Sequence, residues 1–112
     1  MHAGQVKLLE GSAFMRRTGL ARLCKCCNEA LFADYVEQDV PGKLVRLIES
    51  EEDCGVRREL YTCVLKFAER ARLRHVLQQE GAGAALQRAR QREAPEELQV
   101  LCEDCLARLQ PT

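Results

Sequence analysis

The sequence predicts an all-α protein built from stacked helical repeats, and three observations lead to this fold class. Apolar residues recur at helical spacing in every long segment, whereas the alternation typical of strands is missing. Gly and Pro punctuate the chain at residues 11, 41–42 and 81–83, which divides it into segments of helix length. Two apolar stripes also match position for position at an offset of 42, because 98 − 56 = 42.

The N-terminal part predicts a partial repeat over residues 1–29. A helix over residues 5–10 precedes a long helix over residues 13–28, whose apolar face consists of Leu20, Leu23, Cys24 and Cys27. The apolar residues at the start of the chain are Val6, Leu8 and Leu9. Little in the sequence covers them, so we expect further repeats or a partner to cover this end.

The next repeat spans residues 30–69. It consists of a short helix over 30–39, a medium helix over 41–50 and a long helix over 56–69. The apolar stripe of the long helix consists of Val56, Leu60, Cys63, Val64 and Phe67. Asp53 lies just before this helix and is a suitable N-cap residue.

The last repeat spans residues 70–110 and has the same three parts, over 70–80, 83–92 and 95–110. Its long helix carries the matching stripe of Leu98, Cys102, Cys105, Leu106 and Leu109. Pro95 fits the first turn of this helix, where a missing N–H costs no hydrogen bond. The short helices match at an offset of 41 (73 − 32 = 41), and the first long helix matches the second at 40 (60 − 20 = 40).

A period near 40 that contains only helices indicates stacked helical repeats, because other folds of similar period contain strands. No single group of three helices can bury its own apolar stripe. Neighbouring repeats must therefore stack into one continuous core, which makes the whole chain one domain.

Residues 40–81 show the repeat best and read VPGKLVRLIESEEDCGVRRELYTCVLKFAERARLRHVLQQEG. They run from a turn and a second helix, through a long third helix, to the next first helix, which ends in an acidic residue and Gly. In this pattern the chain resembles the armadillo family over nearly its whole length, with HEAT-type repeats as a near neighbour. The resemblance implies a right-handed α-solenoid of about two and a half repeats, from the C-terminal part of a longer array.

Composition and charge exclude several classes of function. Lys and Arg number 17 and Asp and Glu number 17, so the chain lacks the positive charge that general nucleic-acid binding requires. No apolar run approaches the roughly 20 residues that span a bilayer, and no secretion signal is visible. We therefore expect a cytoplasmic or nuclear protein that binds neither nucleic acid nor membrane.

The side chains with reactive chemistry predict neither catalysis nor a cofactor. Only His2 and His75 are present, and no nucleophile with a base at supporting spacing accompanies them. The acidic residues 51–53 are read as a helix cap and an exposed loop. The chain is thus expected to have no enzymatic activity.

The seven cysteines are expected to be reduced thiols. Cys24, Cys27, Cys102 and Cys105 fall on core stripes, where a thiol packs as a small apolar group, so no metal site is predicted. Cys26 points off the stripe beside Lys25, a cation that can lower the pKa of a thiol.

The resemblance also implies where a partner binds, because long third helices of armadillo arrays line a concave groove. The expected groove residues are Arg22, Cys26, Thr62, Lys66 and Arg108. Nuclear-import adaptors carry Trp and Asn on these helices. At the Trp position this chain has Thr62 and Asp104, and at the Asn position Lys66 and Arg108. Basic groove residues instead favour an acidic or phosphorylated segment, as in catenin-like relatives.

The expected function is therefore that of a non-enzymatic adaptor or scaffold that binds a protein partner, a peptide or a domain. Two alternatives remain open at this point. One is a co-chaperone or exchange-factor type of armadillo domain that clasps a chaperone lobe. The other is a regulatory module in which the cysteines bind zinc or respond to oxidation.

Overall fold

The computed structural model describes residues 6–110, and every regular element in this range is a helix. In chain order the elements are η1 (Leu8–Glu10), α2 (Ala13–Lys25), η2 (Glu29–Leu31), α3 (Phe32–Glu37), α4 (Val40–Ser50), α5 (Cys54–Ala68), α6 (Ala71–Gln79), α7 (Ala82–Arg92) and α8 (Glu96–Leu109). The all-α class predicted from the sequence is confirmed. None of these helices is both long enough and apolar enough to cross a lipid bilayer.

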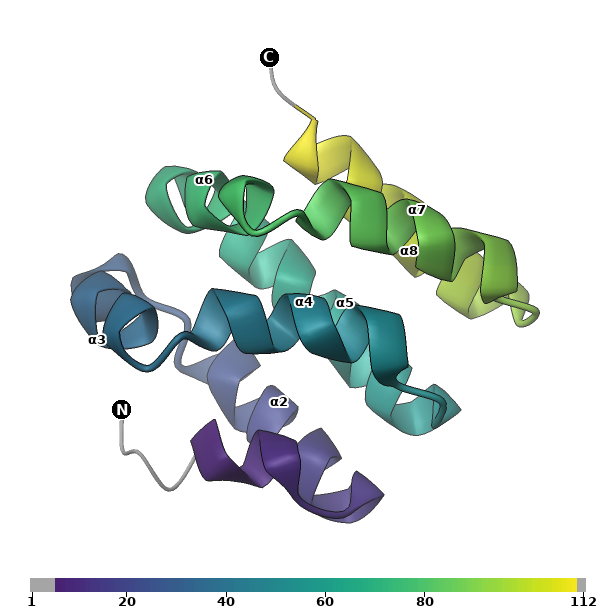
Figure 1. Ribbon diagram of the computed structural model, residues 1–112, viewed down its shortest axis with the longest axis horizontal. Coiled ribbons are helices and arrows are strands. Elements are labelled where there is room, and N and C mark those ends of the chain that lie inside the picture. Colours follow the sequence, from purple (N-terminus) through teal and green to yellow (C-terminus); the bar gives the residue numbers. More distant parts are fainter. Residues whose placement is uncertain (1–5, 111–112) are drawn as a thin grey trace.

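The helices form two layers (Figure 1). The long helices α2, α5 and α8 pack side by side in one layer, and α3, α4, α6 and α7 form the other. The molecule measures 36 × 34 × 19 Å. The shortest dimension is that of two helices of about 10 Å diameter each, as a two-layer arrangement requires.

Equivalent helices run parallel to each other. Arg58 near the start of α5 pairs with Glu97 near the start of α8, with 2.9 Å between Nε and Oε1. Glu69 at the end of α5 pairs with Arg108 at the end of α8. Because starts pair with starts and ends with ends, α5 and α8 point the same way.

The two apolar stripes form the centre of the core. On α5, Val56, Leu60, Cys63, Val64 and Phe67 are each at most 1 % exposed. On α8, Leu98, Cys102, Cys105 and Leu109 are each at most 4 % exposed, and Leu106 packs partly buried against them. Both stripes are confirmed. Burying a Val, Leu or Phe side chain stabilises the fold by about 1.5–3 kcal/mol each.

Side-chain caps fix where several helices begin. Asp53 accepts a hydrogen bond from the Val56 N–H at 3.0 Å, which confirms it as the N-cap of α5. Ser12 caps α2 in the same way. Pro95 differs from the expectation, because it is the N-cap residue of α8 with extended backbone (ψ 129°), and the first turn begins at Glu96.

The first long helix ends earlier than predicted, at Lys25 rather than at residue 28. Asn28 adopts an extended conformation, and its side chain accepts a hydrogen bond from the Ala30 N–H at 2.9 Å, which starts η2. A local cap of this kind competes with continued helix. Cys24 and Cys27 are half-buried, and Cys27 packs against the core, so the apolar stripe predicted for this helix is confirmed only in part.

The turns before α4 and α7 show the residue offset between equivalent positions of the two segments. Asp39 (φ 55°) and Gly81 (φ 86°) are the left-handed residues of the described range, and 81 − 39 = 42. Tyr35 and Leu77, also 42 apart (77 − 35 = 42), are both fully buried. An offset of 41 would instead pair the buried Leu77 with Val36 (77 − 36 = 41), but Val36 is 47 % exposed. The offset of the short helices is thus corrected to 42.

The expectation that the start of the chain lies uncovered is wrong for two of its three apolar residues. Val6 is 5 % and Leu9 3 % exposed, and both belong to the core. They are buried because η1 packs against α2. Leu8 is half-buried. Residue 5, where the predicted helix begins, lies outside the described residues.

Candidate functional site

The five residues predicted to bind a partner lie on the exposed surface of the α2, α5 and α8 layer. They are Arg22, the α2 C-cap residue Cys26, Thr62 and Lys66 of α5, and Arg108 of α8. All are exposed except Thr62, which is half-buried. The structure brings them into one layer but not into one cluster, because Arg22 and Arg108 line different hollows.

Arg108 lies at the edge between α6 and α8. Its guanidinium pairs with Glu69, with 3.4 Å between Nη1 and Oε1, and 52 % of its side chain is exposed. It borders a hollow of about 480 Å³, whose other lining residues are Ala71, Arg74, His75, Gln78, Ala107 and Gln110. Its charge is therefore partly neutralised, and it is set apart from the hollow that Arg22 lines.

Thr62 and Cys26 have local structural roles. The Thr62 hydroxyl donates to the Arg58 carbonyl at 2.9 Å, one helical turn earlier. Cys26 closes α2, because its N–H donates to the Arg22 carbonyl at 3.0 Å. Its own carbonyl accepts a hydrogen bond from the Tyr35 hydroxyl at 2.8 Å. The thiol of Cys26 remains exposed.

Lys66 lies on α5 close enough to Cys24 of α2 to affect its thiol. Burial raises the pKa of the Cys24 thiol, and the nearby Lys66 ammonium opposes this shift. Lys66 itself is exposed and forms no ion pair within residues 6–110. Of the five predicted residues, Arg22 and Lys66 are thus the ones whose charges remain available.

A hollow of about 320 Å³ runs along α2. Its lining residues are Phe14, Arg17, Thr18, Ala21, Arg22 and Lys25 of α2 and Glu59 of α5. Sequence reasoning found Arg22 but missed Phe14, whose side chain is 78 % exposed. The available signal was a large aromatic side chain outside the apolar stripe of its helix.

Unpaired positive charge gathers at the α2 side of the layer. On α5 and α8, Arg58 and Arg108 are both held by carboxylates. Arg17, Arg22 and Lys25 form no ion pair within the described residues 6–110. On the equivalent surface of α8 the acid Asp104 is exposed instead.

The positions of some of these cations at helix ends explain them without the need for a ligand. Arg22 and Lys25 lie in the last turn of α2, Lys66 in that of α5 and Arg108 in that of α8. A cation there offsets the negative end of the helix dipole and contributes about 0.3–1 kcal/mol. Arg17 lies in the middle of α2, so the dipole does not account for it.

Two buried carboxylates, each at the end of a helix, pair with an arginine of a long helix, and sequence reasoning missed them. Glu51 and Glu93, 42 residues apart (93 − 51 = 42), are each 5 % exposed. Glu51 accepts from Arg16 Nε at 2.6 Å, and Glu93 accepts from Arg57 Nε at 3.1 Å. The reading of Glu51 as part of an exposed acidic loop is therefore corrected. The signal for both was an acid repeated at one period.

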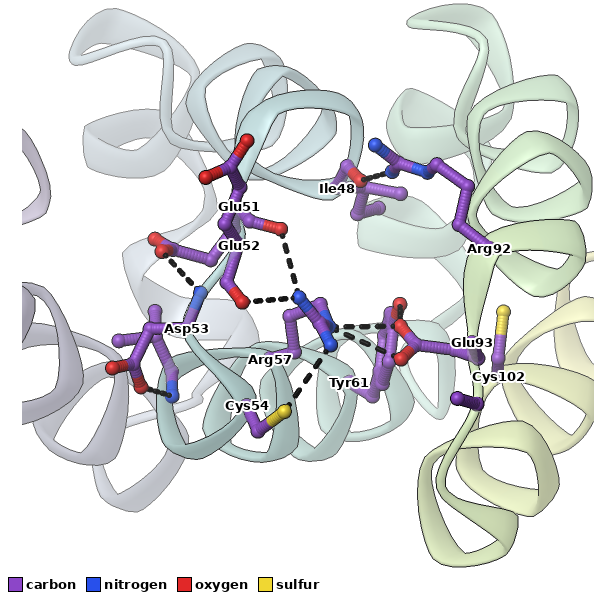
Figure 2. Close-up of polar contacts among 12 residues, drawn as sticks. Ile48, Glu51, Glu52, Asp53, Cys54, Arg57, Tyr61, Arg92, Glu93 and Cys102 are labelled. Carbon is purple, nitrogen blue, oxygen red and sulfur yellow. Dashed lines mark hydrogen bonds and ion pairs between the residues drawn. The ribbon is translucent and has the colours of Figure 1, made fainter.

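The Glu93 site is a closed network of polar groups (Figure 2). Its carboxylate also accepts from the Tyr61 hydroxyl at 2.5 Å. Arg57 reaches the other way, donating to the Glu52 carbonyl at 2.6 Å. Burial is the main cause that raises the pKa of Tyr61, and the Glu93 carboxylate raises it further. The phenol therefore stays protonated and acts as a donor. Every group has a partner, which fits a structural role.

The buried thiols show the chemistry of packed side chains. Burial raises the pKa of Cys102 to about 11 and raises that of Cys63 well above its ordinary value. A raised pKa keeps a thiol in the unreactive protonated form at neutral pH. Within residues 6–110, no three His, Cys, Asp or Glu side chains lie close enough to hold a metal ion.

Comparisons with known proteins add no relative to this description. No protein-family model, no curated protein and no solved structure matches the chain. The candidate site therefore rests on its own geometry, which is an exposed layer of parallel helices with available cations along α2 and on Lys66.

Proposed function

We propose that this chain is part of a right-handed, armadillo-like α-solenoid that binds an acidic segment of a partner protein. The segment would lie on the exposed surface of α2, α5 and α8. In this proposal the chain is an adaptor or scaffold of the cytoplasm or nucleus and catalyses no reaction. Fold alone does not fix function, so the proposal depends on the surface and its charges.

The observation that carries the proposal is the contrast between paired and unpaired cations. Arg16 and Arg57 are paired with buried carboxylates that connect repeats. Arg22 and Lys66 stay exposed with no ion pair within the described part of the chain. Carboxylate or phosphate groups of a ligand are the natural partners of such cations.

The parallel packing of equivalent helices supports the solenoid part of the proposal. In a stack of repeats each unit contacts its neighbours, and the long helices together form an extended surface. Such a surface suits an extended segment, because successive side chains meet successive helices. The spacing of 42 residues between Asp39 and Gly81 (81 − 39 = 42) is what such a stack requires.

Binding of a fluorescein-labelled peptide of alternating aspartate and serine tests the proposal by fluorescence anisotropy. Lys66→Glu should weaken binding about tenfold, the effect expected where a charge contact becomes a repulsion. Arg108→Glu should weaken it less, because Glu69 already neutralises Arg108. Circular dichroism should show unchanged helix content in both variants, since both side chains are exposed.

Arg46→Glu is the matched control. Arg46 lies on α4 in the other layer and is 63 % exposed, paired with Asp39, whose side chain is 50 % exposed. Its reversal changes the net charge by the same amount as Lys66→Glu. If Arg46→Glu weakens the peptide as much as Lys66→Glu does, binding follows net charge and the assigned surface is wrong. If no acidic peptide binds, the acidic partner is wrong.

A further inference from the structure

The hollow along α2 combines an apolar wall with a basic rim. The residues of α2 that line it follow the pattern i, i+3, i+4, i+7, i+8 and i+11, so they form one face of the helix. They are Phe14, Arg17, Thr18, Ala21, Arg22 and Lys25. Across this face stands Glu59 of α5. The middle of the face carries the small residues Thr18 and Ala21, which leaves the space of about 320 Å³ open.

Phe14 is the apolar part of this wall. At 78 % exposure it is the most accessible of the large hydrophobic side chains in the described range. The core does not use it, because Leu20 and Leu23 bury the opposite side of α2. An exposed aromatic ring next to arginines is the composition that protein-binding sites favour.

The charge of the hollow selects what can enter it. Three cations and one acid line it, a balance of +2 (3 − 1 = 2). None of the three cations forms an ion pair within residues 6–110. The hollow at Arg108 lacks this combination, because no large hydrophobic side chain lines it. Of its two arginines, Arg108 is paired with Glu69.

The length of the hollow limits the ligand. Phe14 and Lys25 are 11 residues apart (25 − 14 = 11), which is about 16 Å along a helix. An extended chain covers that distance in about five residues. A short linear segment is therefore sufficient to reach from the aromatic ring to the last cation.

We propose that this hollow docks a short segment of a partner protein in which one large apolar side chain is flanked by acidic residues. The apolar side chain packs on Phe14 over Thr18 and Ala21. The acids pair with Arg17, Arg22 and Lys25. This inference rests on the proposed function and deepens it, because it names the site and the composition of the bound segment.

The test uses two fluorescein-labelled peptides and the full-length chain. In the first, one phenylalanine is flanked on both sides by aspartate and glutamate; in the second, alanine replaces the phenylalanine. The first should bind about tenfold more tightly than the second, an increment of the size that one buried aromatic side chain supplies. Phe14→Ala should remove this difference, because it should weaken binding of the phenylalanine peptide much more than that of the alanine peptide.

Arg22→Glu and Lys25→Glu should each weaken both peptides, and Arg46→Glu on α4 should weaken neither. If Phe14→Ala leaves the preference for phenylalanine intact, the hollow is not the site of the apolar side chain. If Lys66→Glu still weakens binding in that case, the proposed function stands and only this inference is overturned.

Two further outcomes overturn the inference in other ways. If neither peptide binds to the wild-type protein, an acidic segment is the wrong ligand, and both proposals are refuted. Sedimentation measurements test whether a second copy of the chain, and not a partner segment, binds in the hollow. If the protein forms concentration-dependent dimers that Phe14→Ala dissociates, and Phe14→Ala does not affect peptide binding, the hollow is a site of self-association.

Discussion

The buried carboxylate of Glu93 offers the sharpest test of how the helices are held together. Its side chain is 2 % exposed and pairs with Arg57, itself 15 % exposed. We consider Glu93→Gln, which keeps the shape and an acceptor for the Tyr61 hydroxyl but removes the negative charge (Figure 2). The variant leaves the Arg57 guanidinium largely buried without its counter-charge.

Breaking a buried ion pair by removing one partner costs about 3–5 kcal/mol. Two features of the structure reduce the cost here. Arg57 retains hydrogen bonds to the Glu51 and Glu52 carbonyls, and it keeps some contact with solvent. We therefore expect Glu93→Gln to lower the free energy of unfolding by about 2–3 kcal/mol, out of about 5–15 kcal/mol for a typical domain.

The chain contains its own exposed control. Arg58 of α5 and Glu97 of α8 form an ion pair one residue along from Arg57, with side chains 52 % and 60 % exposed. Glu97→Gln should cost about 0–1 kcal/mol, because water and salt screen such a pair. Urea unfolding followed by circular dichroism measures both, and Arg57→Met with Glu93→Gln completes a double-mutant cycle.

The reasoning is refuted if Glu93→Gln and Glu97→Gln change the free energy of unfolding equally. It is also refuted if the coupling between Arg57 and Glu93 is below about 0.5 kcal/mol, the value of a surface pair. Added salt gives an independent check. It should weaken the contribution of Glu97 and leave that of Glu93 nearly unchanged, because buried pairs are screened little.

Three other predictions follow from single features. Although burial raises the pKa of Glu51, hydrogen bonds from Arg16 and from backbone amides lower it overall. A carboxyl whose pKa is lower in the folded state stabilises the fold above its unfolded pKa of about 4.3 and loses this contribution in acid. In acid titrations, the free energy of unfolding of Glu51→Gln should therefore fall less steeply below about pH 4 than that of the wild type. Gly81→Ala should cost about 1–2 kcal/mol in urea unfolding because of its left-handed φ of 86°, whereas Gly83→Ala, in helix with open space around it, should not destabilise; equal effects would contradict this. An aromatic disulfide reagent should label two exposed thiols rapidly and three buried ones only on unfolding, and simultaneous labelling of all would argue against this packing. The exposed thiols are Cys26 and Cys54, and the buried ones are Cys63, Cys102 and Cys105.

Much of the fold could be predicted because the apolar stripes are local. The positions of Val56, Leu60 and Phe67 on one helical face follow from their spacing alone, and all three are buried. The repeat of this stripe at Leu98 to Leu109 located the equivalent helix. The cap at Asp53 was also predictable, because a capping side chain bonds within its own segment.

The candidate site could be predicted only in part. Arg22 and Lys66 are exposed as expected, but the sequence did not reveal that Glu69 neutralises Arg108. That pair joins residues 39 positions apart (108 − 69 = 39), a separation over which one sequence gives no contact information. Phe14 was missed for a related reason, since an aromatic residue in a helix is ordinarily assigned to a core.

By itself the sequence determined the helices, their apolar faces and the period that repeats them. These depend on spacing within one segment, and helical geometry converts spacing into direction. Only the tertiary structure decided which polar groups are buried, which cations keep a partner and which of Tyr35 and Val36 faces the core. The physical reason is that the burial of Glu51 and Glu93 depends on an arginine from the preceding long helix, and the free energy of each pair exists only once the helices are packed together.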